Sequence, residues 1–371
     1  MAGVKRKYNG MCGKRLLTGV LTLAVTIAAQ AQTVRQQLAD DLRQQTTFGG
    51  YVIGQASVNN KEGADKHADM GIRLVRLYVD GRMLNVAYKL QLQVNGMPGN
   101  VSGPRIVDAW AEWQHWKEFR IKFGQMKRPF TFENPMHPWS IGFGAYSQLT
   151  NMLTGFTDRT GEHASNGRDF GLQLQGDLFP ARFDGHRWLH YQVGVFNGQG
   201  TNAVDANTRK DVIGGLIFSP IEHLQIGAFG WTGNFVKDGI TVDRNRYAFG
   251  LNYAGKKVTV RSEFAVSEGH KVKDYFDNEG NRLANPTGSD GADSWYVAVA
   301  VPVAPRTKIW GKWDVYRDAK TWDTARQMFC LTGEHRFHPN LMLQANYTFN
   351  DDHLSTDRHY HNFDVQLYWR F

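Results

Sequence analysis

The chain has 371 residues, of which 43 are Lys or Arg and 35 are Asp or Glu, giving a formal net charge of +8. Mean hydropathy is −0.46, and beyond the N-terminal segment no run approaches the roughly 18 apolar residues of a membrane helix, which excludes a helical membrane protein. Aromatic residues still make up 13% of the chain, whereas cysteine occurs only twice. Only Cys330 lies beyond the N-terminal segment, so we expect neither an intrachain disulfide nor a cysteine metal cluster.

Residues 1–31 have the pattern of a secretory signal peptide. Basic residues precede an apolar run from Leu16 to Ala29, and Ala29-Gln30-Ala31 forms a small-x-small cleavage site. A retained N-terminal membrane helix is the alternative, but the run is too short to span a bilayer comfortably. Removal of the segment leaves 38 basic against 35 acidic residues. The charge of the mature chain therefore gives no reason to expect nucleic-acid binding.

Beyond a polar, Gln-rich and weakly helical segment at residues 32–46, apolar and polar residues alternate in short runs. The last run places Phe363, Val365, Leu367, Trp369 and Phe371 on one face and polar residues on the other. A period of two predicts β-strands, and about ten residues suffice for a tilted strand to cross a bilayer. Sixteen such strands are expected, at 48–58, 71–80, 84–94, 105–113, 119–126, 168–178, 189–197, 211–219, 224–231, 246–254, 258–267, 294–303, 308–316, 327–337, 341–350 and 362–371.

The links between these strands alternate in length. Tight links at Gly81-Arg82, Gly255-Lys256, 304–306 and 338–340 separate long polar links at 57–69, 97–104, 233–243 and 268–293. One rim of an outer-membrane barrel carries short periplasmic turns and the other carries long extracellular loops. A soluble sandwich, the alternative all-β fold, has no reason to keep this alternation. The sequence therefore predicts a transmembrane antiparallel β-barrel over residues 47–371, preceded by the signal peptide (1–31) and a periplasmic lead-in (32–46).

The longest link runs from Lys127 to Gly167 and is rich in Phe, Trp, Pro and Met. Apolar residues in a long loop usually mark a segment that packs against something. Two placements remain open for this loop. It can fold into the lumen, or it can cap the barrel at a subunit contact.

Four segments resemble the phosphate-selective porin O and P family. They are Gly124-Gln125-Met126-Lys127-Arg128-Pro129-Phe130 with the long loop after it, Gly167-Arg168-Asp169-Phe170-Gly171, the run from Arg73 to Gly81, and the terminal Tyr368-Trp369-Arg370-Phe371. The resemblance implies a sixteen-stranded homotrimer in the outer membrane, in contact with lipid and lipopolysaccharide. It also implies a pore whose basic residues favour small anionic solutes, phosphate among them.

The polar face of each strand should point inward, because Lys or Arg facing lipid at mid-bilayer costs about 2–4 kcal/mol. Basic side chains on the inner wall suit anions, since they replace lost hydration with charge-assisted hydrogen bonds. By this alternation, and from the position where the long loop leaves the wall, we expect the pore-lining basic residues to be Arg76, Lys89, Arg120, Lys122, Lys127, Arg128, Arg261 and Lys312. Inward acids are expected at Asp108, Glu112, Asp169, Asp177, Glu263, Asp314, Glu334 and Asp364. A mixed wall of mutually paired charges is therefore the alternative to anion preference.

Other chemistries have weak support. His163-Ala164-Ser165-Asn166-Gly167 lacks the first glycine of a nucleophile elbow. The histidines of residues 353–361, with Asp351 and Asp352, could bind a metal but fit a solvated loop better, and residues 290–293 supply too few oxygens for a calcium loop. We therefore expect no catalytic, cofactor or metal residues, and predict an outer-membrane porin for passive diffusion of small solutes. A structural or adhesin barrel and an outer-membrane hydrolase are the alternatives.

Overall fold

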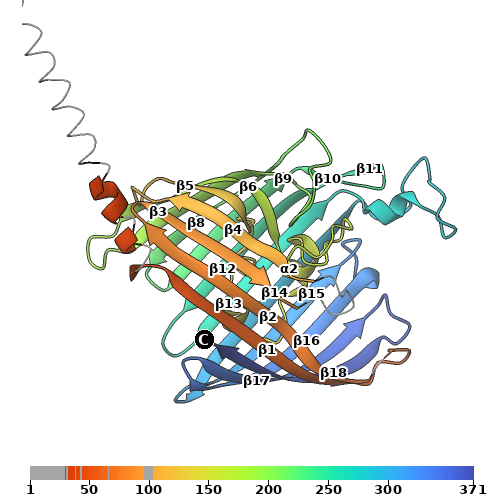
Figure 1. Cartoon of the computed structure of the whole chain (residues 1–371). Coiled ribbons are helices and arrows are strands. Elements are labelled where there is room, and N and C mark those ends of the chain that lie inside the picture. Colours follow the sequence, from red (N-terminus) through yellow and green to blue (C-terminus); the bar gives the residue numbers. More distant parts are fainter. Residues whose placement is uncertain (1–29, 31, 38, 42–43, 66, 96–102) are drawn as a thin grey trace, which may run out of the picture.

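The computed structural model describes residues 30, 32–37, 39–41, 44–65, 67–95 and 103–371 (Figure 1). The predicted signal peptide lies outside the described residues, except for Gln30. In the predicted lead-in, residues 32–37 and 39–41 are helical and mostly exposed. Within these described ranges, no helix is both long and apolar enough to span a membrane.

Within the described residues, sixteen strands pair with their neighbours in one closed antiparallel barrel, which the pairing of β1 with β18 completes (Figure 1). The first nine are β1 (Thr47–Asn59), β2 (Ala68–Met83), β3 (Val86–Gln93), β4 (Arg105–Trp113), β5 (Arg120–Lys127), β6 (Arg168–Pro180), β7 (Arg187–Phe196), β8 (Asp211–Ile221) and β9 (Leu224–Thr232). The other seven are β12 (Asn245–Ala254), β13 (Thr259–Glu268), β14 (Gly291–Ala304), β15 (Thr307–Arg317), β16 (Ala325–His338), β17 (Leu341–Asp352) and β18 (His359–Arg370). Each predicted strand overlaps one of these, so the predicted fold class is confirmed.

One predicted turn is wrong. Gly81-Arg82 lies inside β2, which continues to Met83, and the tight link is Leu84–Asn85, where Leu84 has φ +54°. Position 81 has no room for a side chain, because a Cβ there would lie 2.7 Å from the hydroxyl of Tyr88 on the neighbouring strand. The glycine therefore marks a close approach of side chain to backbone rather than the turn itself.

The link predicted at 233–243 contains a hairpin, β10 (Asn234–Lys237) and β11 (Ile240–Asp243), joined by Asp238-Gly239. Both joining residues have positive φ, 54° and 72°, as a two-residue hairpin turn requires. The hairpin packs against the 3-10 helix η2 (Val272–Tyr275) of the 269–290 loop through buried Phe235, Ile240, Val242 and Val272. We call this pair of segments the outer module.

The outer surface of the barrel is apolar and the inner surface is polar. Leu77, Leu90 and Phe123 are exposed on the outer face, where a transmembrane barrel carries its apolar residues. Arg76 and Asp108, on the other face, are only 5% exposed. The alternation of apolar and polar residues along each strand therefore correctly predicts which side chains point outward and which point into the lumen.

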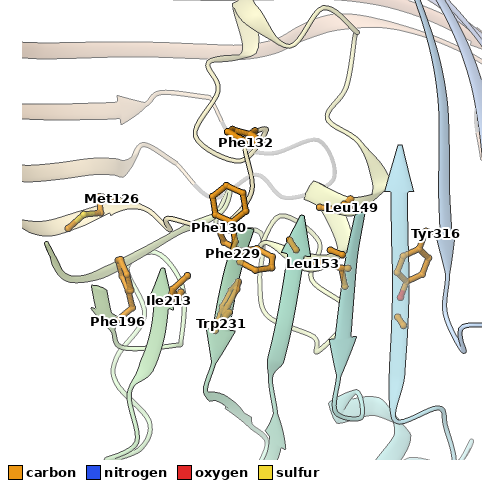
Figure 2. Packing of buried hydrophobic residues seen from close by; sticks show 13 residues of the cluster. Met126, Phe130, Phe132, Leu149, Leu153, Phe196, Ile213, Phe229, Trp231 and Tyr316 are labelled. Carbon is orange, nitrogen blue, oxygen red and sulfur yellow. The ribbon is translucent and has the colours of Figure 1, made fainter. Parts of the chain in front are cut away.

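The loop after β5 folds into the lumen. It contains the 3-10 helix η1 (Pro138–Ser140) and the helix α2 (Gln148–Leu153). Phe130, Phe132 and Leu153 pack on Phe229 and Trp231 of the inner wall (Figure 2). Space for the loop comes from small inward residues on β12 to β14, all fully buried: Ala248, Ala265 and Ala292. The apolar composition of this loop is thus explained by packing inside the barrel.

Candidate pore constriction

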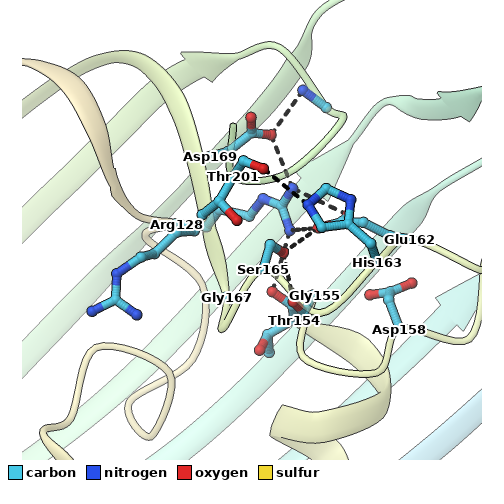
Figure 3. A network of polar contacts seen from close by, with 12 residues as sticks. Arg128, Thr154, Gly155, Asp158, Glu162, His163, Ser165, Gly167, Asp169 and Thr201 are labelled. Atoms are coloured by element: carbon cyan, nitrogen blue, oxygen red, sulfur yellow. Dashed lines mark hydrogen bonds and ion pairs between the residues drawn. The ribbon is translucent and has the colours of Figure 1, made fainter. Parts of the chain in front are cut away.

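The base of the inward loop is held by a buried network of ion pairs (Figure 3). Arg128 lies 2.9 Å from Glu162 Oε1 and 2.9 Å from Asp169 Oδ2. Arg244, which precedes β12, also pairs with Glu162 and lies 2.6 Å from Asp211. None of these five side chains is exposed. Burying charge is costly unless it is paired in this way.

Trp231 lies at the centre of this network. The guanidinium carbons of Arg128, Arg244 and Arg246 lie 4.8, 4.6 and 4.7 Å from the centroid of its ring, within the range of cation–π attraction. Arg246 also holds Asp158 of the loop at 2.7 Å. The base of the loop is therefore fixed to β9 and β12 by charge and ring contacts together.

The charge of Glu162 is stabilised by its partners. Burial raises the pKa of this carboxyl, but the charges of Arg128 and Arg244 outweigh that effect and leave the pKa below its usual value. Glu162 therefore stays ionised at neutral pH and links the loop to both arginines.

The middle of the loop is held by wall carboxylates. Glu263 accepts hydrogen bonds from the backbone N–H groups of Phe132 (2.6 Å) and Glu133 (2.9 Å). Asp314 accepts one from the backbone N–H of Gln148 at 3.1 Å, at the start of α2. Both acids were predicted to face the lumen, and they do, but they bind the loop.

The far part of the loop reaches the opposite wall. Gly144 donates its N–H to Asn346 Oδ1 (3.1 Å) and accepts a hydrogen bond from Gln366 Nε2 (3.1 Å). The ring of Trp139 lies 6.0 Å from that of Tyr368. The loop thus crosses the lumen from β5 to β17 and β18, and it must narrow the channel.

The wall from β18 through β4 carries a row of arginines. Arg370 pairs in register with Tyr51, Tyr51 with Arg76, Arg76 with Gln93, and Gln93 with Arg105. Directly paired residues of antiparallel strands share one face. Arg76 donates to the Tyr51 hydroxyl (3.1 Å) and to Gln93 (3.2 Å), so the row faces inward with Tyr51 and Gln93 between its charges.

The positive charges of this wall affect the pKa of His137 in the loop. Burial, together with the positive charges of Arg76, Lys89, Arg168 and Arg370, lowers the pKa of its imidazole to about 3. Its ring lies 4.5 Å from that of Tyr51. The loop and the basic wall therefore face each other closely.

Residues 45–225 match the model of a family described as phosphate-selective porins O and P. The resemblance found in the sequence is confirmed. The chain is an outer-membrane porin. No curated protein sequence matches it.

Solved structures share its fold at low identity. The anion-selective porin from Comamonas acidovorans is 14% identical, with 88% of this chain and 99% of that chain covered and a TM-score of 0.65. OmpF of Salmonella typhi, in complex with daunomycin, is 11% identical, with 88% and 97% covered and a TM-score of 0.63. The outer membrane channel DcaP of Acinetobacter baumannii is 13% identical, with 88% and 97% covered and a TM-score of 0.59. The family match and the shared fold imply a channel rather than an enzyme.

The predicted pore-lining residues of the porin divide into two groups. Arg76, Lys89, Arg120, Lys122 and Lys127 lie on the inner wall of β2 to β5. Lys122 lies 3.8 Å from the centroid of the Trp110 ring, and Lys89 and Arg120 lie 3.6 and 2.7 Å from Asp80 and Asp177. Lys127 lies 4.5 Å from the Phe156 ring centroid. These five remain candidates for contact with solute.

The other three hold the loop. Arg128 belongs to the buried network, and its unexposed side chain cannot line the pore. Lys312 is 2% exposed and lies 3.1 Å from Asp314. Arg261 donates to the carbonyls of Ser140 (2.9 Å) and Ile141 (3.1 Å). Alternation identified the side of the wall but could not show which inward charges the loop would cover.

Two basic residues of the wall were missed. Arg105 opens β4, and Arg168 opens β6 beside Lys127, its partner in register. Arg168 is held by Asp108, with nitrogen–oxygen distances of 2.8 and 2.9 Å. Both residues begin predicted strands, where alternation alone gives a weak signal. The position of Arg168 in the segment resembling the porin family could have revealed it.

Two histidines of the last long loop lie close to Asp351 and Arg358. Asp351 lies 2.6 Å from Arg358 and 3.6 and 3.3 Å from His353 and His359. Across the part of the chain that is described, no group of three His, Cys, Asp or Glu is placed to hold a metal ion.

Proposed function

We propose that the porin is an anion-preferring diffusion pore, with phosphate among the solutes that it favours. The row Arg370, Arg76 and Arg105 carries this proposal, because its charges alternate with uncharged Tyr51 and Gln93. On the other side of the lumen, the carboxylates of Glu263 and Asp314 accept hydrogen bonds from backbone N–H groups of the loop. The field in the open channel is therefore set mainly by the basic wall.

The narrowed lumen strengthens that field. Charges act more strongly where the loop displaces water and lowers the effective dielectric constant. Arg76 is 5% exposed and its terminal nitrogens donate to Tyr51 and Gln93, so it acts on a passing anion through its charge. Arg370 is exposed, so its guanidinium can exchange the hydration of an anion for charge-assisted hydrogen bonds. The mixed-wall alternative requires acids of equal weight on this wall, and Asp108 is already committed to Arg168.

The test is the reversal potential of single channels in a salt gradient, with Arg76→Gln and Arg105→Gln combined. We expect anion preference in the unmodified porin and a clear shift toward cations in the variant. Arg358→Gln, in the last extracellular loop, is the matched control and should leave the potential unchanged. A pore without anion preference at low salt would establish the mixed wall.

Differences in strand length around the barrel support a homotrimer. β3, β4 and β5 have 8, 9 and 8 residues, whereas β14 and β16 have 14 each. A tilted strand needs about 9–11 residues to cross a bilayer, so the β3–β5 wall is the part least suited to face lipid. A neighbouring subunit would cover it, while the taller walls would contact lipid and lipopolysaccharide. OmpT of Vibrio cholerae has been solved in a trimer form.

Site-specific cross-linking tests this arrangement in a Cys330→Ser background. Phe123→Cys on the outer face of β5 should give linked subunits, whereas Val299→Cys on β14 should not. Linking at Val299 alone would place the subunit contact elsewhere. N-terminal sequencing of the outer-membrane form tests the proposed cleavage after Ala31 and the 32–46 lead-in.

A further inference from the structure

A cavity of about 400 Å³ lies between α2 of the loop and the inner face of β16, β17 and β18. This volume is within the range of small-molecule sites in proteins. The cavity adjoins the start of β16, the end of β17 and the start of β18. These ends meet at the rim with the long loops, so the cavity opens into the outer vestibule, before the constriction.

The wall of the cavity is built from residues in register. Met328 pairs with Asn350 and Asn350 with Tyr360, and Arg326 pairs with Asp352 in the row above. The opposite side is α2, whose position is fixed when Gln148 donates its side-chain N–H to the Arg326 carbonyl at 2.9 Å. Both sides of the cavity are therefore held by hydrogen bonds.

Charge in this cavity is balanced. Arg326 Nε lies 3.8 Å from Asp352 Oδ1, and both residues line the cavity. The residues of the basic row, from Arg370 on β18 to Arg105 on β4, are not among the residues that line the cavity. An anion gains little here from net charge.

Uncharged hydrogen-bonding groups supply most of the remaining polar surface. Asn350 donates its side-chain N–H to the Tyr360 carbonyl (3.3 Å), and Asn151 donates to the Tyr146 carbonyl (3.1 Å). Each amide keeps its oxygen as an acceptor. With Arg326, the Asp352 carboxylate and the amide of Asn362, the cavity lining offers both donors and acceptors. It therefore suits a ligand that can both donate and accept hydrogen bonds, which a chloride ion cannot do.

We propose that this cavity binds a neutral, hydroxyl-rich solute of the sugar or polyol class as it enters the pore. A hydroxyl group donates and accepts at once, which matches amide side chains. Tyr360 and Met152 provide apolar surface for the C–H faces of a sugar ring. The inner wall of the porin would then carry two separate sites, an arginine row that favours anions and a cavity that retains neutral hydroxylated solutes. This inference rests on the porin fold and not on the proposed anion preference.

The experiment measures the current through single channels in potassium chloride while sucrose is added. We expect a saturable decrease in current for the unmodified porin. Asn362→Leu should raise the half-saturating sucrose concentration by about fivefold, the effect of one lost hydrogen bond. Gln192→Leu, an amide change on β7 away from the cavity, is the matched control and should keep the unmodified value. Asn151→Leu on α2 gives a second reading if the strand variant assembles poorly.

Three results would overturn the proposal. The first is a decrease in current proportional to sucrose without saturation. The second is equal behaviour of Asn362→Leu, Asn151→Leu and Gln192→Leu. The third is saturable block by inorganic phosphate that Asn362→Leu abolishes, which would place an anion in the cavity. Reversal potentials measured without sugar report separately on the anion preference.

Discussion

Arg128 and Glu162 form a bidentate ion pair, with nitrogen–oxygen distances of 2.9 and 3.1 Å and neither side chain exposed. They come from the two ends of the loop between β5 and β6, here called the constriction loop, so the pair joins the two ends of that loop. Arg244 then ties that closed loop to the barrel through Glu162 and Asp211.

Glu162→Gln should loosen the loop while the barrel still forms. Removing one partner of a buried ion pair typically costs about 3–5 kcal/mol, because it leaves an uncompensated charge. We expect a lower temperature for the shift in gel mobility on heating, and a noisier single-channel current. Asp351→Asn, which breaks the more exposed pair with Arg358, should cost less than about 1 kcal/mol. Equal effects of the two changes would argue against the anchoring role of Glu162.

Lys122 and Lys312 should behave in opposite ways, although both are inward lysines. Lys122→Glu changes a charge on the basic wall and should shift the reversal potential toward cations. Lys312→Met should leave the potential almost unchanged but destabilise the porin by about 3–5 kcal/mol, since Asp314 would remain buried without its partner. Reversal potentials and denaturant titrations of both variants separate the two roles. A selectivity change in the Lys312 variant would show that its charge reaches the pore.

Acidification from pH 8 to pH 5 should not alter the anion preference. Arginine does not titrate in this range, and His137, with a pKa lowered to about 3, stays neutral in the folded porin. The unfolded chain protonates this histidine near pH 6.5. The folded state therefore loses stability as the pH falls from about 6.5 toward 3.

Reversal potentials and heat-induced gel shifts measured across this range test both expectations. A rising anion preference between pH 7 and pH 5 would mean that a group in the pore titrates in this range. His137→Gln, which cannot titrate, should reproduce the selectivity of the unmodified porin and weaken the loss of stability on acidification.

Shortening the loop should widen the pore. Deleting residues 138–146 removes the contacts of Trp139 with Tyr368 and of Gly144 with Asn346 and Gln366, but it keeps α2 and the buried network at the base. We expect a higher single-channel conductance with normal assembly. Unchanged conductance would mean that another segment sets the narrowest point.

The strands were predictable because each carries its own signal. The alternation in residues 105–113 predicted both ends of β4, since one face of the strand is apolar and points outward and the other meets polar groups of the lumen. The site was less predictable because inward charges look alike in sequence. Arg76 and Arg128 are both inward arginines, yet only Arg128 meets two buried carboxylates of distant segments. The distinction depends on where the loop lies, and no local pattern encodes that position.

The contacts between the outer module and the constriction loop limit which sequence changes either segment can accept. The constriction loop bonds to it through the Thr160 carbonyl, which accepts from the Val272 N–H at 3.1 Å, and through Arg159, which donates to the Ser289 carbonyl at 3.3 Å. Surface loops ordinarily tolerate changes of sequence and length. Here a change in the 269–290 loop also disturbs the segment that sets the bore of the channel. These two stretches should therefore be inherited as a matched pair, and a constriction loop transplanted from another porin would lack its partners.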